Sequence, residues 1–461
     1  MSSAVDTSKP DPDGGATVAG VPRSRIVVAS MVGTSIEFYD FYIYATAAVS
    51  VFPHLFFPKG NGTTALLASL ATFGLAFVAR PLGSILFGHF GDRIGRKTTL
   101  VGSLLTMGIA TFVIGLLPTY HQIGIVAPAL LALMRFCQGL GLGGEWSGAA
   151  LLATETAQKG KRAWAAMWPQ LGAPIGFFLA NGLFLIITLF LDHDNSSPDL
   201  DGAFLTWGWR IPFLLSAIMV MIGLYVRLKL EETPVFARAV ARGEKVKTPI
   251  AEVFKTSWRQ LIIGTFVMLA TYTLFYIMTT WVLSYGTGKT PAQGGTGAGF
   301  HYTDFLVLQL VAVLFFAGAV PVSGWLADRF GRRITLLTIT GFIMLFGLTF
   351  GVMLNQDGMS NARMLVFLAI GMLLMGMTFG PMSAVLPELF PTNVRYTGSG
   401  IAYNTASILG AAVAPFIATW LATSYGVGWV GIYLLIAAAL TFIALLVMKE
   451  TKNESLDDVG A

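Results

Sequence analysis

Charged residues and cysteines are scarce in this sequence. Its 29 basic and 24 acidic residues are 11% of the 461 positions, whereas soluble domains average about 25%. So few charges could not cover several water-soluble domains, and the 55% of apolar residues excludes a disordered chain. The single cysteine, Cys137, excludes an intramolecular disulfide and a cysteine-based metal cluster. A net charge of +5 is too small to indicate nucleic-acid binding. These absences predict an integral membrane protein.

Long apolar segments make up most of the chain. A helix that crosses a membrane needs about 20 mostly apolar residues, and twelve such segments follow the polar first 24 residues. They lie near residues 26–52, 64–90, 98–117, 123–153, 163–191, 207–228, 257–285, 302–327, 334–354, 362–387, 396–423 and 427–448. We therefore predict an all-α polytopic membrane protein with 12 transmembrane helices.

The polar segments predict how the chain is divided. No polar segment between the spans is long enough for a separate soluble domain, and residues 1–24 lack the apolar core of a signal peptide. The longest internal polar segment is basic and predicts short amphipathic helices. We expect a disordered tail, a six-helix bundle, a linker with short helices, a second six-helix bundle and a short tail, at residues 1–24, 25–228, 229–256, 257–448 and 449–461.

The distribution of basic residues predicts the orientation. With the N-terminus inside, 23 of the 29 Lys and Arg residues fall on the inner side, four fall in outer loops and two lie within spans. Cytoplasmic loops of membrane proteins carry such an excess. We expect both termini in the cytoplasm, a location in the cytoplasmic (inner) membrane and a monomer in the lipid bilayer.

The sequence repeats itself at about half its length. Gly, Asp, Arg, Gly and Arg positions after the second span recur after the eighth at a constant offset of 236, and Glu155 with Arg162 recurs as Glu388 with Arg395 at an offset of 233. Such a repeat indicates two six-helix halves in the same orientation. We interpret these loops as an inner-face latch, in which Arg residues pair with Glu155 or Glu388. The alternative is that the Arg residues only obey the positive-inside rule, which leaves the repeated Asp unexplained. The predicted latch consists of Gly88, Asp92, Arg93, Gly95, Arg96, Glu155, Arg162, Asp328, Arg329, Arg332, Glu388 and Arg395.

Several of these motifs resemble one family of transporters. The pattern Gly-x-x-x-Asp-Arg-x-Gly-Arg-Lys from Gly88, and the segment Arg135–Gly144, resemble signatures of the major facilitator superfamily. Pro387–Pro391 resembles a piece shared with sugar porters. Glu37–Phe41, Ala79–Gly83 and Gly143–Trp146 narrow the resemblance to the metabolite:proton symporter family, over about residues 26–448. The resemblance implies the major facilitator fold and alternating access of a site between two halves.

Charged residues inside the predicted spans are the first candidates for function, because a buried charge costs several kcal/mol unless it is paired or hydrated. At a rise of ~1.5 Å per residue, Glu37, Arg80 and Glu145 lie roughly 15–17 Å from the inner helix ends, near the midplane. We predict that Asp40 and Arg135 form the proton switch, in which separation of the pair lets Asp40 bind a proton. Glu37 and Glu145 are rival proton carriers. The alternative is a static ion-pair network between helices.

Arg80 is the predicted substrate residue, because its bidentate fork suits a carboxylate better than a neutral sugar. It could instead only neutralise Glu37 or Glu145. Further candidates are polar or aromatic residues in the middle of spans that line the cavity in this family. They are Tyr42, Gln138, Trp168, Gln170, Tyr272, Tyr276, Tyr403 and Asn404.

The leading hypothesis is proton-coupled uptake of a small organic anion, such as a mono- or dicarboxylate, with the proton as coupling ion. The alternative in the same family is uptake of a zwitterion such as proline or betaine. Drug:proton export and a non-transporting sensor are weaker alternatives. We predict no enzyme, because no Ser/His, paired-Asp or metal arrangement is present. Gly139–Gly144 formally matches Gly-x-Gly-x-x-Gly, but no strand precedes it, and we expect no cofactor, metal or nucleic acid.

Overall fold

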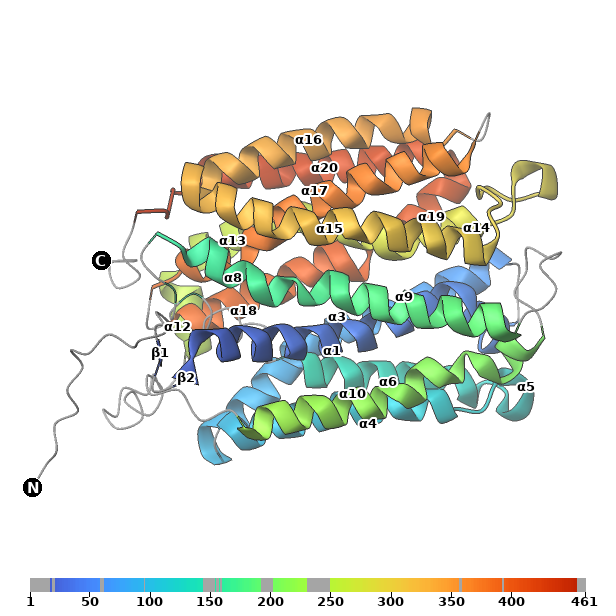
Figure 1. The fold of residues 1–461 in the computed structure, drawn as a ribbon, viewed down its shortest axis with the longest axis horizontal. Coiled ribbons are helices and arrows are strands. Elements are labelled where there is room, and N and C mark those ends of the chain that lie inside the picture. The colour runs from blue at the N-terminus through green and yellow to red at the C-terminus, as the bar shows by residue number, and fades with distance from the viewer. Residues whose placement is uncertain are drawn as a thin grey trace, which may run out of the picture.

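Helices that run roughly parallel to one another build the molecule (Figure 1). The computed structural model describes residues 17–18, 21–58, 62–94, 96–143, 154, 157, 160–191, 202–229, 249–355, 359–391 and 394–453. Within these ranges, the helices correspond to the twelve predicted spans, and the prediction of an all-α membrane protein is confirmed. Nine of the helical segments are long and apolar enough to cross a membrane, and Val101–Leu116 and Val126–Leu142 are shorter apolar helices.

The first six spans form what we call the N-terminal half. Its helices are α1 (Arg23–Ser50), α2 (Phe52–Leu55), α3 (Gly62–Ile94), α4 (Arg96–Leu116), α5 (Tyr120–Ile123), α6 (Val126–Leu142), α8 (Arg162–Gln170), α9 (Gly172–Leu191), η1 (Phe204–Gly208) and α10 (Arg210–Lys229). Within it α1 packs on α9, α3 on α6 and α4 on α10. The break between α8 and α9 follows from Pro174, which has no amide hydrogen to donate to the carbonyl of Gln170.

The last six spans form the C-terminal half. Its helices are α12 (Pro249–Thr256), α13 (Trp258–Tyr276), η2 (Ile277–Trp281), α14 (Val282–Thr287), η3 (Pro291–Gln293), α15 (Tyr302–Phe330), α16 (Arg332–Met353), α17 (Asn361–Glu388), α18 (Arg395–Ala406), η4 (Ser407–Ala412), α19 (Ala414–Tyr425) and α20 (Val427–Val447). Here α15 packs on α17 and α16 on α20. The π-helical turns η2 and η4 widen the seventh and eleventh spans, and Pro415 after η4 cannot donate a hydrogen bond to Ala411.

The two halves lie side by side, and α8, α9 and α3 contact α15, α17 and η4 across the junction (Figure 1). Exposed apolar side chains such as Ile109, Phe190, Leu345 and Val447 cover the outer helices, as contact with lipid requires. We call the end of the bundle that carries Arg162 and Glu388 the latch end, and the opposite end the α14 end.

One segment differs from its prediction. Within the stretch predicted to be a disordered tail, β1 (Thr17–Val18) and β2 (Val21–Pro22) pair antiparallel, with Val18 opposite Val21. A pairing this short has no periodic sequence pattern to reveal it. Between the predicted bundles, the short helix α12 falls within the predicted linker, and residues 230–248 lie outside the described residues.

Candidate functional site

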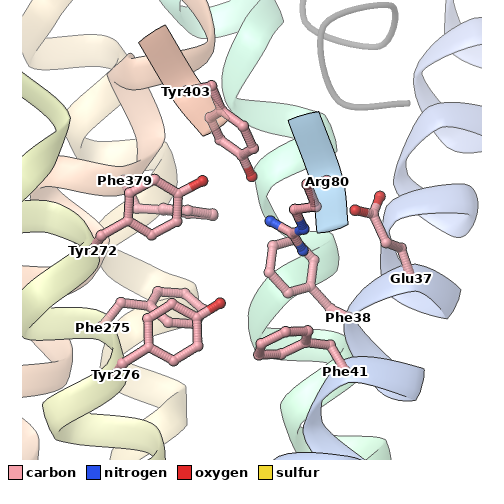
Figure 2. Close-up of a pocket in the computed structure, with 9 residues that line it drawn as sticks. All are labelled: Glu37, Phe38, Phe41, Arg80, Tyr272, Phe275, Tyr276, Phe379 and Tyr403. Atoms are coloured by element: carbon pink, nitrogen blue, oxygen red, sulfur yellow. The ribbon is translucent and has the colours of Figure 1, made fainter. Parts of the chain in front are cut away.

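A small cavity lies between the two halves, and charged and aromatic side chains line it (Figure 2). Its volume is about 10 Å³, roughly what one water molecule needs. Helices α1 and α3 contribute from the N-terminal half, and α13, α17 and α18 contribute from the C-terminal half. The lining residues are Glu37, Phe38, Phe41, Arg80, Tyr272, Phe275, Tyr276, Phe379 and Tyr403. The structure therefore brings together Glu37, Arg80 and three of the predicted tyrosines at one place.

Arg80 lies at the centre of this group. Its side chain is 6% exposed, and its guanidinium carbon lies 4.9 Å from the ring centroid of Phe77. Figure 2 shows the guanidinium facing Tyr272, Tyr276 and Tyr403 from the other half, with Glu37 on its other side. The Nε atom is buried and has no hydrogen-bond partner among the described residues. A buried cation with an unused donor between the two halves is suited to bind an anionic group.

Asp40 and Arg135 are both buried, and the structure does not join them in an ion pair. Thr111 and Gln138 lie between them. The Thr111 Oγ1 atom is 3.2 Å from Asp40 Oδ2, Gln138 Nε2 donates to Thr111 Oγ1 at 2.7 Å, and Arg135 Nη1 donates to Gln138 Oε1 at 3.1 Å. The Asp40 Oδ1 atom has no hydrogen-bond partner. In this conformation the predicted proton pair is thus separated and connected by a polar relay.

Aromatic rings occupy the space around Arg135. Its guanidinium carbon lies 4.0 Å from the ring centroid of Tyr44 and 4.9 Å from those of Phe41 and Phe73. Its Nε donates to the carbonyl of Phe73 at 3.3 Å, whereas its Nη2 is without a partner. The electron-rich ring faces stabilise a buried guanidinium, which explains how Arg135 stays in the core without a carboxylate beside it.

The latch end joins the halves through a buried ion-pair cluster. Arg162 of the N-terminal half donates to Glu388 of the C-terminal half at 3.0 Å. Arg332 also pairs with Glu388, at 3.2 Å, and with Asp328, at 3.1 Å. Asp328 accepts hydrogen bonds from the backbone amides of Ala163 and Trp164 at 3.1 and 2.8 Å, so it also caps the first turn of α8. The predicted pairing of a loop arginine with Glu388 is present.

Other predicted latch residues lie elsewhere or outside the described residues. Arg329 is exposed and stacks on Trp325, and Arg395 Nε donates to the carbonyl of Phe390 at 3.2 Å. The backbone of α3 and α4 is described around the first copy of the motif, but its side chains are not. Predicted residues whose side chains or whole positions fall outside the described part are Gly88, Asp92, Arg93, Gly95, Arg96, Glu145 and Glu155.

Five predicted substrate residues do not line the cavity, and one of them, Gln138, lies in the relay between Asp40 and Arg135. Tyr42 packs against Phe177 with ring centroids 4.9 Å apart, and Trp168 is half-buried and packs against Trp164. Gln170 Nε2 donates to the carbonyl of Phe379 at 3.1 Å, and Asn404 Nδ2 donates to Ser84 Oγ at 3.2 Å. These two amides link the halves, so a role in closing them fits the geometry better than a role in the present cavity.

Sequence reasoning missed two sets of residues. The first is the phenylalanines of the cavity wall, although Phe38 and Phe41 belong to the same motif as Glu37 and their helical spacing was a usable signal. The second set consists of residues that follow α20, in the predicted C-terminal tail. Glu450 accepts hydrogen bonds from the amides of Arg332 and Arg333 at 2.9 and 3.0 Å, and Thr451 Oγ1 donates to Glu388 at 2.6 Å. The repeat does not extend to these residues, so it gave no signal for them.

A membrane-embedded bundle of two six-helix halves, with a charged cavity between them and a latch at one end, defines a membrane transporter rather than an enzyme. The profile of the family described as "Sugar (and other) transporter" matches residues 26–461. The chain belongs to this family, within the major facilitator superfamily, and the resemblance found in the motifs is confirmed.

Named relatives cover nearly all of the chain. It is 57% identical to the inner membrane metabolite transport protein YhjE of Escherichia coli (strain K12), over 94% of this chain and 96% of that protein. It is 34% identical to the shikimate transporter of the same strain, over 98% and 100% of the two chains. It is 35% identical to a proline/betaine transporter of Salmonella typhimurium (strain LT2), over 95% of this chain and 85% of the relative. The chain is thus a multi-pass membrane transporter of small metabolites.

Solved structures share the fold. The proton:xylose symporter XylE bound to 6-bromo-6-deoxy-D-glucose superposes with a TM-score of 0.68 at 18% identity, over 95% of this chain and 98% of the other. The inferred twelve-helix major facilitator fold is confirmed by this likeness, which at such low identity concerns the fold alone.

Proposed function

We propose that the protein is a proton-coupled symporter that takes up a small organic anion, a mono- or dicarboxylate, by alternating access. The observation that carries the proposal is Arg80, a buried guanidinium between the halves with an unpartnered Nε. The three tyrosines that face it add hydroxyl groups from the opposite half. A carboxylate bound by Arg80 and these hydroxyls would draw the two halves together, which couples binding to closure.

The environment of Asp40 supports proton coupling. Its side chain is 2% exposed, and one of its oxygens has no hydrogen-bond partner. An ionised carboxylate held there without a counterion would cost several kcal/mol, so the arrangement suits a carboxyl group that carries a proton. Arg135, held back by Gln138, is the cation that would replace this proton when the pair closes. We infer no cofactor beyond the coupling proton.

We infer that the latch end faces the cytoplasm and that the protein resides in the cytoplasmic membrane. The excess of basic residues in the loops that were assigned to the inner side supports this orientation. A relative that carries "inner membrane" in its name supports the location. With the latch closed, substrate would enter from the α14 end and leave after Arg162 and Glu388 separate.

A second candidate is uptake of a zwitterion such as betaine. The cavity wall holds four phenylalanines and three tyrosines beside Glu37, and aromatic cages with a nearby carboxylate are suited to quaternary ammonium groups. Arg80 would then bind the carboxylate of the zwitterion and Glu37 would balance its positive end. One of these rings, Phe41, already stacks on Arg80, as does Phe77 outside the cavity wall, and for that reason the anion remains the leading candidate.

Uptake by proteoliposomes tests the proposal. The purified protein would be supplied with labelled mono- and dicarboxylates that include shikimate, and with proline and betaine, with and without an inward proton gradient. A one-to-one symporter of a monoanion in a gradient of one pH unit would support accumulation of up to about tenfold, because a tenfold ratio corresponds to ~1.4 kcal/mol. Carboxylate uptake that ignores the gradient would contradict proton coupling.

Glu37→Gln separates the two candidates. If the substrate is a zwitterion, loss of the negative charge should lower its uptake by about tenfold or more. If the substrate is an anion, its uptake should stay within about twofold of the wild-type rate or rise, because the negative charge of Glu37 beside the anion is removed. Glu252→Gln on α12, a residue that does not line the cavity, is the control.

A further inference from the structure

The Thr111 hydroxyl is the central group of the relay between Asp40 and Arg135. The hydroxyl of Thr111 contacts three groups: it lies 2.9 Å from the carbonyl of Met107, 3.2 Å from Asp40 Oδ2, and it accepts a hydrogen bond from Gln138 Nε2 at 2.7 Å. Asp40, Thr111 and Gln138 are each 2% exposed or less, so bulk water does not complete the network.

A hydroxyl has one proton to donate and two lone pairs that accept. If Asp40 is protonated, its O–H donates to Thr111, Gln138 donates to the other lone pair, and Thr111 gives its own proton to Met107. Every position of the hydroxyl is then used. If Asp40 is ionised, it cannot donate, and Thr111 must turn its proton from Met107 toward the carboxylate.

We propose that the Thr111 hydroxyl is a two-position switch that senses the protonation of Asp40 and, through Gln138, controls whether Arg135 is held apart from it. The proposal rests on the proposed proton coupling. Thr111 keeps its proton throughout and only rotates, whereas the proton that is transported binds to and leaves the carboxyl of Asp40. Thr111 is thus a positioning residue that acts through Asp40.

The switch acts on the hydrogen bond from Arg135 Nη1 to Gln138 Oε1, which holds Arg135 away from Asp40. When Thr111 turns its proton toward an ionised Asp40, its lone pairs turn as well, which weakens the hydrogen bond from Gln138 Nε2, and the negative charge attracts Arg135. The Arg135 Nη2 atom has no partner and is available for the carboxylate. Where side chains are described, the charged and titratable groups on the surrounding elements are Glu37, Tyr39, Tyr42 and Tyr44 on α1, Arg80 on α3, Arg135 and Cys137 on α6, Arg210 and Tyr225 on α10, and Tyr276 on α13; α4 over residues 101–116 and α9 contribute none.

Infrared difference spectra between two pH values test the switch without a known substrate. In the wild type we expect a protonated-carboxyl band that Asp40→Asn removes. Thr111→Val, which keeps the shape of the side chain but removes the hydroxyl, should shift this band to higher frequency because the carboxyl loses its hydrogen bond. Thr111→Ser should restore the band. Thr106→Val is the matched control, because Thr106 lies on the same helix and donates only to the carbonyl of Gly102.

Transport measurements give the functional counterpart. With the member of the uptake panel that is transported fastest, Thr111→Val should lose gradient-driven accumulation by about tenfold or more. Exchange of labelled for unlabelled substrate, which needs no net proton movement, should stay within about threefold of the wild type. If Thr111→Val does not fold, Gln138→Met removes the bonds to Thr111 and Arg135 and should give the same separation of accumulation from exchange.

The outcomes of these experiments distinguish failure of the Thr111 switch from failure of the proposed proton coupling. A pH-dependent carboxyl band that survives Asp40→Asn would overturn both the carrier role of Asp40 and the switch. A band that disappears in Asp40→Asn but is unchanged in Thr111→Val, together with normal accumulation, would overturn the switch alone. Equal loss of accumulation and exchange in both Thr111→Val and Thr111→Ser would identify a purely structural role and would also overturn it.

Discussion

At the scale of single residues, buried charges are stabilised by different means at each position. Arg135 is surrounded by aromatic faces and carbonyls, Arg80 lies between Glu37 and tyrosine hydroxyls, and Arg332 is paired with two carboxylates. A buried charge that has full pairing stabilises a conformation, whereas one with a spare donor can bind a ligand. By this criterion Arg332 has a structural role, and Arg80 is the residue to test for substrate binding.

Arg80→Ala should lower carboxylate uptake by a factor of ~30 to ~5000, because removal of one partner of a buried charged hydrogen bond costs about 2–5 kcal/mol. Arg80→Lys should recover only part of the rate, since lysine keeps the charge but lacks the planar fork. Initial rates in proteoliposomes measure both effects. Arg259→Ala, which removes an exposed arginine from α13, is the control. Uptake by Arg80→Ala at the wild-type rate would exclude Arg80 from substrate binding.

At the scale of helices, small residues allow close packing within one half, whereas ion pairs join the two halves. A side chain at Gly139 of α6 would overlap the backbone of Ala76 on α3, and one at Gly83 would overlap Leu140. The glycines thus allow α3 and α6 to touch along their backbones, as small residues do in membrane helices. The latch is different in kind, because Arg162 and Glu388 come from separate halves and can part while Arg332 stays paired with Glu388 within the C-terminal half.

Gly139→Ala should lower the stability of the folded protein by about 1–3 kcal/mol, because the added methyl group overpacks the contact between α3 and α6. Thermal unfolding in detergent, followed by tryptophan fluorescence, measures the change. The control is Gly182→Ala, at a position where an added side chain meets nothing within 4 Å. An unchanged midpoint for Gly139→Ala would mean that the two helices tolerate a wider separation.

Glu388→Gln should open the latch end. The carboxylate pairs with Arg162 and Arg332 and accepts a hydrogen bond from Thr451, and an arginine left buried without its partner destabilises the closed state by about 3–5 kcal/mol. Spin labels on the two halves at the latch end, measured by double electron–electron resonance, should show a longer distance in a larger fraction of molecules. Glu252→Gln is the control, and an unchanged distance distribution would contradict the role of the latch.

At the scale of the whole molecule, described residues of the two halves touch near both ends of the bundle. They meet at the latch end through Arg162 and Glu388, and near the α14 end through the rings of Phe204 and Tyr302, 6.2 Å apart. Between these contacts the cavity around Arg80 has a volume of about 10 Å³, which is too small for a metabolite. Binding therefore requires the halves to separate at one end, as alternating access demands.

Gly324→Trp should prevent closure of the latch end. Gly324 on α15 faces Met167 and the carbonyl of Ala163 on α8, across the junction between the halves, so a bulky ring there acts as a wedge. We expect transport to fall by at least about tenfold, with substrate binding retained in equilibrium measurements on detergent-solubilised protein. Gly318→Trp on the same helix, where an added side chain meets nothing within 4 Å, should transport normally. Normal transport by Gly324→Trp would show that this junction does not need to close.

Much of the fold was predictable from the sequence because a membrane imposes simple rules. Twelve apolar segments had to become helices, since a backbone in lipid must satisfy its own hydrogen bonds, and the repeat required two similar halves. The depth of Glu37 and Arg80 along their helices followed from a fixed rise per residue. Their meeting with tyrosines from distant spans did not follow, because helix order and rotation depend on packing.

The sequence by itself determined the class of protein, the positions of its spans and the short set of buried charges that function must use. Only the tertiary structure decided the partners of those charges. It placed Thr111 and Gln138 between Asp40 and Arg135, and it brought Glu450 and Thr451 to the latch from beyond the last span. The physical reason is that hydropathy acts on each segment separately, whereas hydrogen bonds between helices depend on which faces meet after the whole bundle has packed.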